Sequence, residues 1–194
     1  LPQTDEKEPN DDAARAREVG LDVTVEGALG REDRDVFAFV GRAGQRVTAE
    51  VEAMRLGGPV LDARLRLLDA SGAEVAACDD AALLGQDPVL SAVLPADGRY
   101  ALELHEVTWQ GSGRHRYRLH LGTFPRPLAA SPPTATHDGP TLLGDAAPVG
   151  TEHRLLRGPA GPDGTSPLLV ESTAGVAPSP LLLVATTHPT ACEV

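Results

Sequence analysis

The sequence predicts an all-β protein, a jelly-roll-like antiparallel β-sandwich followed by a smaller β domain. Apolar and polar residues alternate in short runs, which is typical of strands with one buried face. Gly, Asp and Pro separate these runs at intervals of about 8–12 residues, as in sandwiches and barrels. Helix signals are scarce after the first twenty residues. Only the segment Asp12–Arg17 looks helical, with Asp12 as a candidate N-cap.

Eight strands are expected in the first part of the chain. In the run 61–68, Leu65 and Leu67 share one face, whereas Arg64 and Arg66 lie on the other. Tight turns are expected at 69–72 and at 95–98, where Asp and Gly stand together. The expected strands are 23–27, 35–40, 45–53, 61–68, 73–78, 87–94, 99–105 and 116–121.

The composition changes after Thr123, where Pro and Gly become dense and charged residues sparse. We therefore divide the chain into a β-sandwich over 1–123 and a smaller β domain over 124–194. Four apolar runs favour a folded second domain, although a proline-rich linker with fragments of strand is the alternative. These runs are 141–144, 152–156, 168–171 and 181–184.

The charge excludes two classes of partner. The formal net charge of −11 disfavours binding to nucleic acids and to anionic membranes. No apolar run is long enough to span a bilayer, so no membrane insertion is expected. Because Leu1 is not an initiator Met, we expect a mature or excised fragment whose export signal lies outside the chain. Cys78 and Cys192 form no disulfide framework, so the cysteines do not fix the compartment.

The N-terminal segment 5–12 is rich in acidic side chains. Pro9 opposes a helix through it, and in an extended chain Glu6, Glu8 and Asn10 point to the same side. Carboxylate and amide oxygens at this density suit Ca²⁺. The alternatives are a solvated acidic tail or a capping segment for a following helix.

An ordered set of motifs over about 5–122 resembles the bacterial pre-peptidase C-terminal (PPC) domain, a secreted β-sandwich that is similar to the collagen-binding domains of clostridial collagenases. The opening Glu-x-Glu-Pro-Asn-Asp motif is at 6–11, and an Asp-x-Asp-x-Phe turn and strand is at 33–37. A Leu-x-Leu-Leu-Asp-x-x-Gly motif follows at 65–72, and the closing motifs are Asp-Gly-x-Tyr at 97–100 and Tyr-x-Leu at 117–119. The segment from Phe124 to Pro180 is similar, more weakly, to an Ig-like segment that follows such domains.

The resemblance implies a calcium site, because some members of the family bind Ca²⁺ through the acidic opening and the turn before the Asp-x-Phe strand. A divalent cation would also relieve the repulsion between crowded carboxylates. Glu32 is an alternative to Asp33, since the spacing in this turn varies. The candidate ligands are Glu6, Glu8, Asn10, Asp11, Asp33 and Asp35, and a second candidate metal site consists of Asp79, Asp80 and Asp87.

Catalysis has little support, because no serine lies in a Gly-x-Ser-x-Gly motif and no histidines have the spacing of zinc ligands. Trp109, Tyr100 and Tyr117 are candidates for an aromatic ligand-binding platform, although Trp109 could instead close one end of the sandwich. We therefore expect a non-catalytic, secreted or cell-surface accessory module that binds an extracellular protein or polysaccharide. The alternative is a structural spacer or folding-assisting domain. In both cases the chain would be a monomeric part of a multidomain protein.

Overall fold

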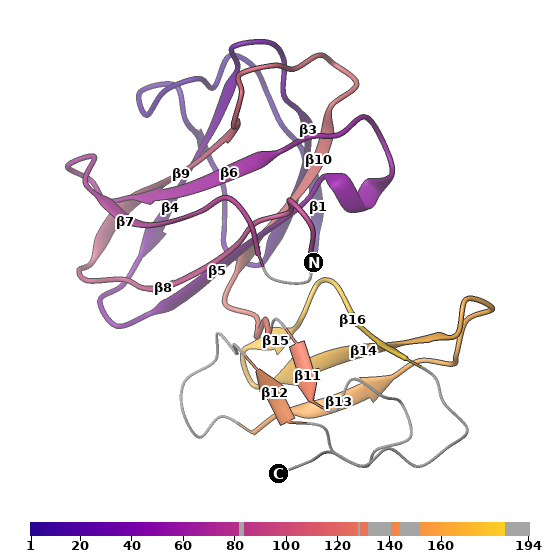
Figure 1. Ribbon diagram of the computed structural model, residues 1–194. Coiled ribbons are helices and arrows are strands. Elements are labelled where there is room, and N and C mark those ends of the chain that lie inside the picture. Colours follow the sequence, from indigo (N-terminus) through magenta and orange to yellow (C-terminus); the bar gives the residue numbers. More distant parts are fainter. Residues whose placement is uncertain (82–83, 128, 132–140, 144–151, 185–194) are drawn as a thin grey trace. The chain divides into compact units, whose positions relative to one another are not determined.

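A computed structural model describes residues 1–81, 84–127, 129–131, 141–143 and 152–184 (Figure 1). The chain divides into two compact units, Leu1–Thr123 and Phe124–Val194. Cys192 lies outside the described residues, and Cys78 is a free, half-buried thiol.

The first unit contains two five-stranded sheets. In spatial order, the first sheet consists of β1 (Gln3–Asp5), β3 (Val23–Ala28), β10 (Arg116–Gly122), β5 (Arg46–Glu52) and β8 (Val89–Val93). The second consists of β2 (Arg17–Glu18), β4 (Arg34–Gly41), β9 (Gly98–Glu106), β6 (Ala63–Leu68) and β7 (Glu74–Cys78). The neighbouring strands are antiparallel except for the pairs β1–β3 and β2–β4. The predicted all-β class is confirmed, and each of the eight expected strands is present.

The core of this unit lies between the two sheets. Alternate residues of each strand enter it, so Val25 and Leu119 of the first sheet belong to the same apolar cluster as Phe37, Leu65 and Leu102 of the second. Each of these five side chains is fully buried. Burial of this apolar surface is the main force that holds the two sheets together.

The N-terminal arm, residues 1–18, connects the two sheets. Its β1 adds a parallel strand to the first sheet, and its β2 adds one to the second. Between them, the carbonyl of Asn10 accepts a hydrogen bond from the Val36 amide of β4 at 3.0 Å. The arm is therefore folded onto the sandwich. The expected helix over Asp12–Arg17 is wrong, because Asp12 instead accepts bonds from the Ala14 and Arg15 amides in a turn and Arg17 begins β2.

The second unit is also built from strands. β11 (Ala129–Ser131) pairs with β12 (Thr141–Leu143). A separate sheet contains β13 (Arg154–Arg157), β14 (Thr165–Ser172), β15 (Gly175–Val176) and β16 (Leu181–Val184). Its small core includes Leu168, Leu181 and Leu183. The four apolar runs thus include strand residues, which favours the folded alternative, and the Ig-like character of this unit stays a prediction.

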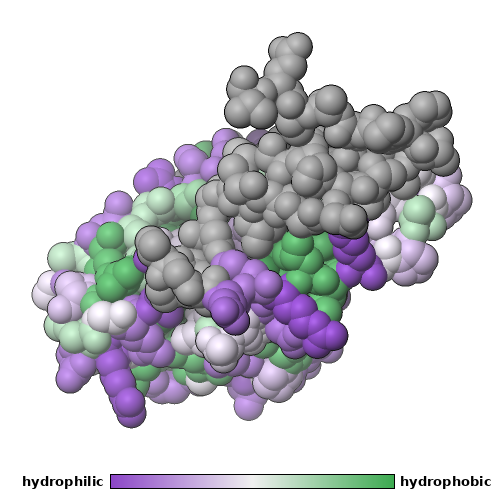
Figure 2. All heavy atoms as spheres, turned by 90° about the horizontal axis from the view of Figure 1, so that it is seen from below, coloured by the Kyte–Doolittle hydropathy of each residue, from purple (hydrophilic) through white to green (hydrophobic). Residues whose placement is uncertain are grey.

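The surface is mixed in polarity. Exposed hydrophobic residues such as Val40, Val60 and Leu182 come from separate segments of the chain. Figure 2 shows hydrophilic residues interspersed among separate hydrophobic areas on the face in view. Among the described residues, no helix has the length and hydropathy that crossing a membrane requires.

Candidate metal centre

Three carboxylates converge at one end of the first unit. One oxygen each from Glu6, Glu8 and Asp35 lies within 4.8 Å of the other two. Glu6 and Glu8 belong to the N-terminal arm, whereas Asp35 is the second residue of β4. Asp35 has the same orientation along β4 as the core residues Phe37 and Phe39, so its carboxyl group is directed between the sheets and is fully buried.

A buried phenol joins two of these carboxylates. The hydroxyl oxygen of Tyr117 lies 2.6 Å from Asp35 Oδ2 and 2.7 Å from Glu6 Oε2. A phenol carries a single proton and can donate it to only one acceptor. The other short contact therefore requires a second proton, on Glu6 or Asp35, or a cation that replaces it.

The electrostatics of the site agree with this requirement. Burial raises the pKa of the Asp35 carboxyl to about 9, and the charges of Glu6 and Asp33 act in the same direction against the opposing effect of the Tyr117 hydrogen bond. Burial also raises the pKa of Glu8, helped by Asp33, Glu6 and Asp11, while the Asn10 amide lowers it. Without a cation, the site is short of positive charge.

Asn10, next to the carboxylates, is a polar residue that the fold leaves unsatisfied. Its side chain is fully buried, yet neither its Oδ1 nor its Nδ2 has a hydrogen-bond partner. Its own backbone amide donates to Glu8 Oε2 at 3.0 Å, which places it beside the cluster. Oδ1 of Asp35 is likewise buried without a partner. Because unpaired buried polar atoms cost about 1–3 kcal/mol each, two such residues side by side call for an explanation.

The backbone around Glu6 shapes the site. The Ala28 amide donates to Glu6 Oε1 at 2.8 Å, and the Glu6 amide donates to the carbonyl of Glu26. Gly27 lies between these two residues, where a Cβ would collide with Glu6 Oε2 and the Tyr117 hydroxyl. Glycine is therefore required for the Glu6 carboxylate and the phenol to approach each other.

The remaining candidates from the acidic arm and the following turn differ in position. Asp33 is near enough to influence the pKa of both Glu8 and Asp35, but its oxygens already accept bonds from the Gly30 and Arg34 amides. Asp11 forms an ion pair with Arg15 at 2.9 Å. Glu32 is exposed and has a φ of 57°. The structure thus brings Glu6, Glu8 and Asp35 together, with Asn10 and Asp33 adjacent.

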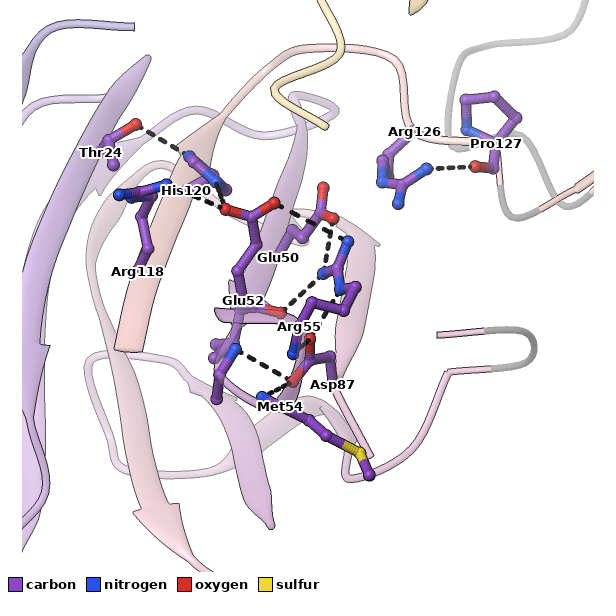
Figure 3. A network of polar contacts seen from close by, with 12 residues as sticks. Thr24, Glu50, Glu52, Met54, Arg55, Asp87, Arg118, His120, Arg126 and Pro127 are labelled. Carbon is purple, nitrogen blue, oxygen red and sulfur yellow. Dashed lines mark hydrogen bonds and ion pairs between the residues drawn. The ribbon is translucent and has the colours of Figure 1, made fainter. Parts of the chain in front are cut away.

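The second candidate metal site is not assembled. Asp87 is buried, and its two oxygens accept bonds from the amides of Ala53, Met54 and Arg55 at 2.7–3.2 Å. Arg55 Nε adds an ion pair with Asp87 at 2.6 Å (Figure 3). This carboxylate therefore holds the start of the helical turn η1 (Met54–Leu56). Asp79 and Asp80 are exposed and do not join it.

The three aromatic candidates are also separated. Tyr100 and Tyr117 are buried in different sheets, so they form no platform with Trp109. Trp109 is 39% exposed, and its ring is parallel to that of His105 with the centroids 4.5 Å apart. It therefore does not close the end of the sandwich as a core residue.

Sequence reasoning missed two participants, Tyr117 and Gly27. The sequence suggests Tyr117 for an aromatic ligand-binding platform and not for the metal centre, although alternation along 116–121 places it on the same face as Leu119 and Leu121, which are buried. This alternation predicts that the Tyr117 hydroxyl lies in the interior of the sandwich. The need for Gly27 depends on a contact between distant segments, which no local pattern reveals.

Part of the first unit matches a known protein family. Residues 33–106 match the family model of the bacterial pre-peptidase C-terminal domain. A probable subtilase-type serine protease of Deinococcus radiodurans is 43% identical over 107 residues, which are 54% of this chain but only 14% of the protease. The chain therefore corresponds to a small part of that relative.

Two solved structures also align with the chain. The pre-peptidase C-terminal domain of a collagenase from Bacillus anthracis aligns with a TM-score of 0.45 and 18% identity, over 60% of this chain and 99% of that one. PliG of Aeromonas hydrophila, a periplasmic inhibitor of g-type lysozyme, aligns with a TM-score of 0.36 and 16% identity, over 55% of this chain and 98% of that one. The family match concerns part of the first unit: residues 33–106 are similar to the bacterial pre-peptidase C-terminal domain.

Proposed function

We propose that this chain is a non-catalytic accessory module of an exported protein, such as a secreted subtilase-type protease, and that Ca²⁺ stabilises its first unit. The family match and the similarity to a probable protease support the first part. The calcium site depends on one observation, the buried and unpartnered Asn10 beside the carboxylates of Glu6, Glu8 and Asp35.

The residues fit a hard cation. Ca²⁺ takes six to eight oxygen ligands from carboxylates, amides and carbonyls, with water completing the shell. Glu6, Glu8 and Asp35 supply carboxylate oxygens, and Oδ1 of Asn10 supplies an amide oxygen. When bound, Ca²⁺ supplies the positive charge that these groups lack. Because Glu6 and Glu8 belong to the arm and Asp35 to β4, the site would fasten the arm to the second sheet.

Binding to an extracellular polymer or protein is the activity that we assign to the module. Trp109 supports a binding function. Its partly exposed indole ring stacks against His105, and its backbone is in a left-handed conformation with a φ of 61°. A left-handed conformation is costly for a large side chain and is often retained at functional sites. A passive spacer, the alternative, needs no such residue.

Thermal unfolding in Ca²⁺ and in EGTA tests the calcium site. We expect the melting temperature to rise with the logarithm of free Ca²⁺, since a ligand at 100 times its Kd stabilises the native state by about 2.7 kcal/mol. An identical melting temperature in Ca²⁺ and EGTA would remove the calcium site from the proposal.

The variant Asn10→Ala makes the test specific. In EGTA it should be as stable as the unchanged protein or more so, because it removes two unsatisfied buried atoms. In Ca²⁺ it should lose most of the stabilisation. Glu18→Gln is the matched control, since Glu18 lies on the same arm but pairs with Arg99 away from the cluster. Full retention of the calcium response in Asn10→Ala would contradict the assignment.

A further inference from the structure

A small basic pocket lies on the outer face of the first sheet. Its volume is about 170 Å³, and Arg114, Arg116, Arg118, Glu26, Leu56 and Gly58 are among the residues that line it. Arg116 and Arg118 alternate with the buried Tyr117 and Leu119 along β10, so both arginines are directed away from the core. Arg114 precedes the strand at the same spacing.

The pocket has more positive charge than its surroundings neutralise. Arg118 forms ion pairs with Glu26 at 3.1 Å and with Glu52 at 3.5 Å. By contrast, Arg114 and Arg116 are exposed, and neither forms an ion pair within the described residues. Two guanidinium groups without an ion pair therefore lie beside one cavity, in a chain whose net charge is −11. Guanidinium groups bind carboxylates through paired, charge-assisted hydrogen bonds.

The other walls favour a ligand that is partly apolar. Leu56 is 39% exposed and belongs to η1. Gly58 also lines the pocket, close to the Arg114 carbonyl, and presents no side chain to it. Glu26 also lines the pocket, and its carboxylate, which pairs with Arg118 through Oε1, can accept hydrogen bonds from hydroxyl groups. The pocket thus combines an apolar surface, a hydroxyl acceptor and two free cations.

We propose that this pocket binds one carboxylated sugar unit of an acidic polysaccharide. The carboxylate would pair with Arg114 and Arg116, a hydroxyl would donate to Glu26, and the apolar face of the ring would rest on Leu56. The volume of about 170 Å³ is below the ~300–1,000 Å³ of pockets that enclose drug-sized ligands, which suits one unit of a longer chain. The proposal names a ligand class for the binding module proposed above and depends on that function.

The topology argues against a peptide ligand. Extended peptides commonly bind by adding a strand to the edge of a sheet. β10 is not an edge strand, because it pairs with β3 on one side and with β5 on the other. The backbone groups of β10 therefore already form hydrogen bonds with the two neighbouring strands, and only its outward side chains are available to bind a ligand.

Calorimetric titration of the full chain with short oligomers of hyaluronan and of polygalacturonate tests the proposal. Both contain uronic acids, and a neutral cello-oligosaccharide and poly-glutamate of similar length serve as comparison ligands. We expect binding to at least one uronate oligomer, and weaker or no binding to the comparison ligands. Added salt should weaken the binding because it screens the charges.

The variants Arg116→Gln and Arg114→Gln should each weaken uronate binding by about tenfold, the loss expected for one charge-assisted pair. Arg42→Gln, which removes an exposed arginine in the turn after β4, should leave binding unchanged. The proposal is overturned if neither uronate oligomer binds, if Arg42→Gln has the same effect as the pocket variants, or if poly-glutamate binds more tightly. A calcium-dependent melting temperature in the same preparation would show that the proposed calcium site survives such a failure.

Discussion

The hydroxyl of Tyr117 in the first sheet lies 2.6 Å from the Asp35 carboxylate in the second, a side-chain hydrogen bond across the interior of the sandwich. Glu6 of the N-terminal arm approaches the same hydroxyl at 2.7 Å. Both sheets and the arm therefore meet at one phenolic oxygen. The stability of this end of the fold should depend on how the charge of the two carboxylates is balanced.

Replacing Tyr117 with Phe should destabilise the protein by about 1–3 kcal/mol, because the buried Asp35 carboxyl and the half-buried Glu6 carboxylate both lose their contact with the phenolic hydroxyl. It should also change the apparent calcium affinity, since both carboxylates are candidate ligands. Urea unfolding in Ca²⁺ and in EGTA measures both effects.

Tyr100→Phe is the matched control for this change. The Tyr100 hydroxyl donates to the Ala96 carbonyl at 2.7 Å, so its loss should have a comparable cost for stability. Its effect should be the same with and without Ca²⁺. If both variants respond equally to Ca²⁺, Tyr117 has no special relation to the cation.

The stability of the metal-free protein should fall as the pH rises. Burial raises the pKa of Asp35 in the folded protein to about 9, well above the usual range of an aspartate, so the folded protein holds this proton more tightly than the unfolded chain does. The corresponding stabilisation is complete below about pH 4 and is lost as the pH rises through about 9. Unfolding in EGTA at a series of pH values between 5 and 9 should show the decrease.

Asp35→Asn separates this effect from other titrations. The amide has no proton to lose, so the variant should show a weaker pH dependence in EGTA than the unchanged protein. A steeper decrease in the variant, or equal slopes, would mean that Asp35 does not control the pH response.

Gly27→Ala should disrupt the centre through a single methyl group. A Cβ at this position collides with Glu6 Oε2 and the Tyr117 hydroxyl, so one of them must move. We expect a loss of about 1–3 kcal/mol, as for other overpacked sites, together with weaker calcium binding. Gly20→Ala is the control, since no atom lies within 4 Å of a Cβ there. Equal melting temperatures for the two variants would contradict this account.

Alternation and turn chemistry were sufficient to predict the eight main strands of the first unit. They could not predict β1 and β2, because each is short and is defined by its pairing with a distant strand. The sequence around Asp12 predicts a helix where the structure has a turn, for a related reason. A capping aspartate has the same local bonds in an isolated turn as at the start of a helix.

The candidate site was predictable in part. The period of two along the acidic arm placed Glu6, Glu8 and Asn10 together, and the family resemblance added Asp35. The sequence could not show that the Asp87 carboxylate accepts hydrogen bonds from the amides of 53–55, because these residues are more than thirty positions away in the chain. Nor could it show which arginines lack a partner, since Arg118 is paired and Arg116 differs from it only in three-dimensional context.

Trp109→Gly should change the stability little, by less than about 1 kcal/mol. Loss of the stack against His105 should lower the free energy of unfolding by about 0.5–1.5 kcal/mol. Glycine adopts the left-handed conformation without strain, which should raise it by about 1–2 kcal/mol. If Trp109 were a core residue at the end of the sandwich, its removal would cost about 3–5 kcal/mol. The melting temperature of the variant distinguishes these cases, and a loss in the larger range would restore the structural interpretation.

Asp87→Ala should be one of the most destabilising changes to an acidic residue of the first unit. It removes the acceptor for three backbone amides of residues 53–55 and the partner of the Arg55 guanidinium at 2.6 Å. Breaking a buried ion pair from one side costs about 3–5 kcal/mol, because the remaining groups stay desolvated. Asp79→Ala and Asp80→Ala remove the same charge from exposed positions and should cost less than about 0.5 kcal/mol.

The loss of stability in Asp87→Ala should be the same in Ca²⁺ and in EGTA, because the Asp87 carboxylate binds backbone amides and Arg55. A loss that appears only in Ca²⁺ would instead restore the second metal site, in which Asp79, Asp80 and Asp87 act together.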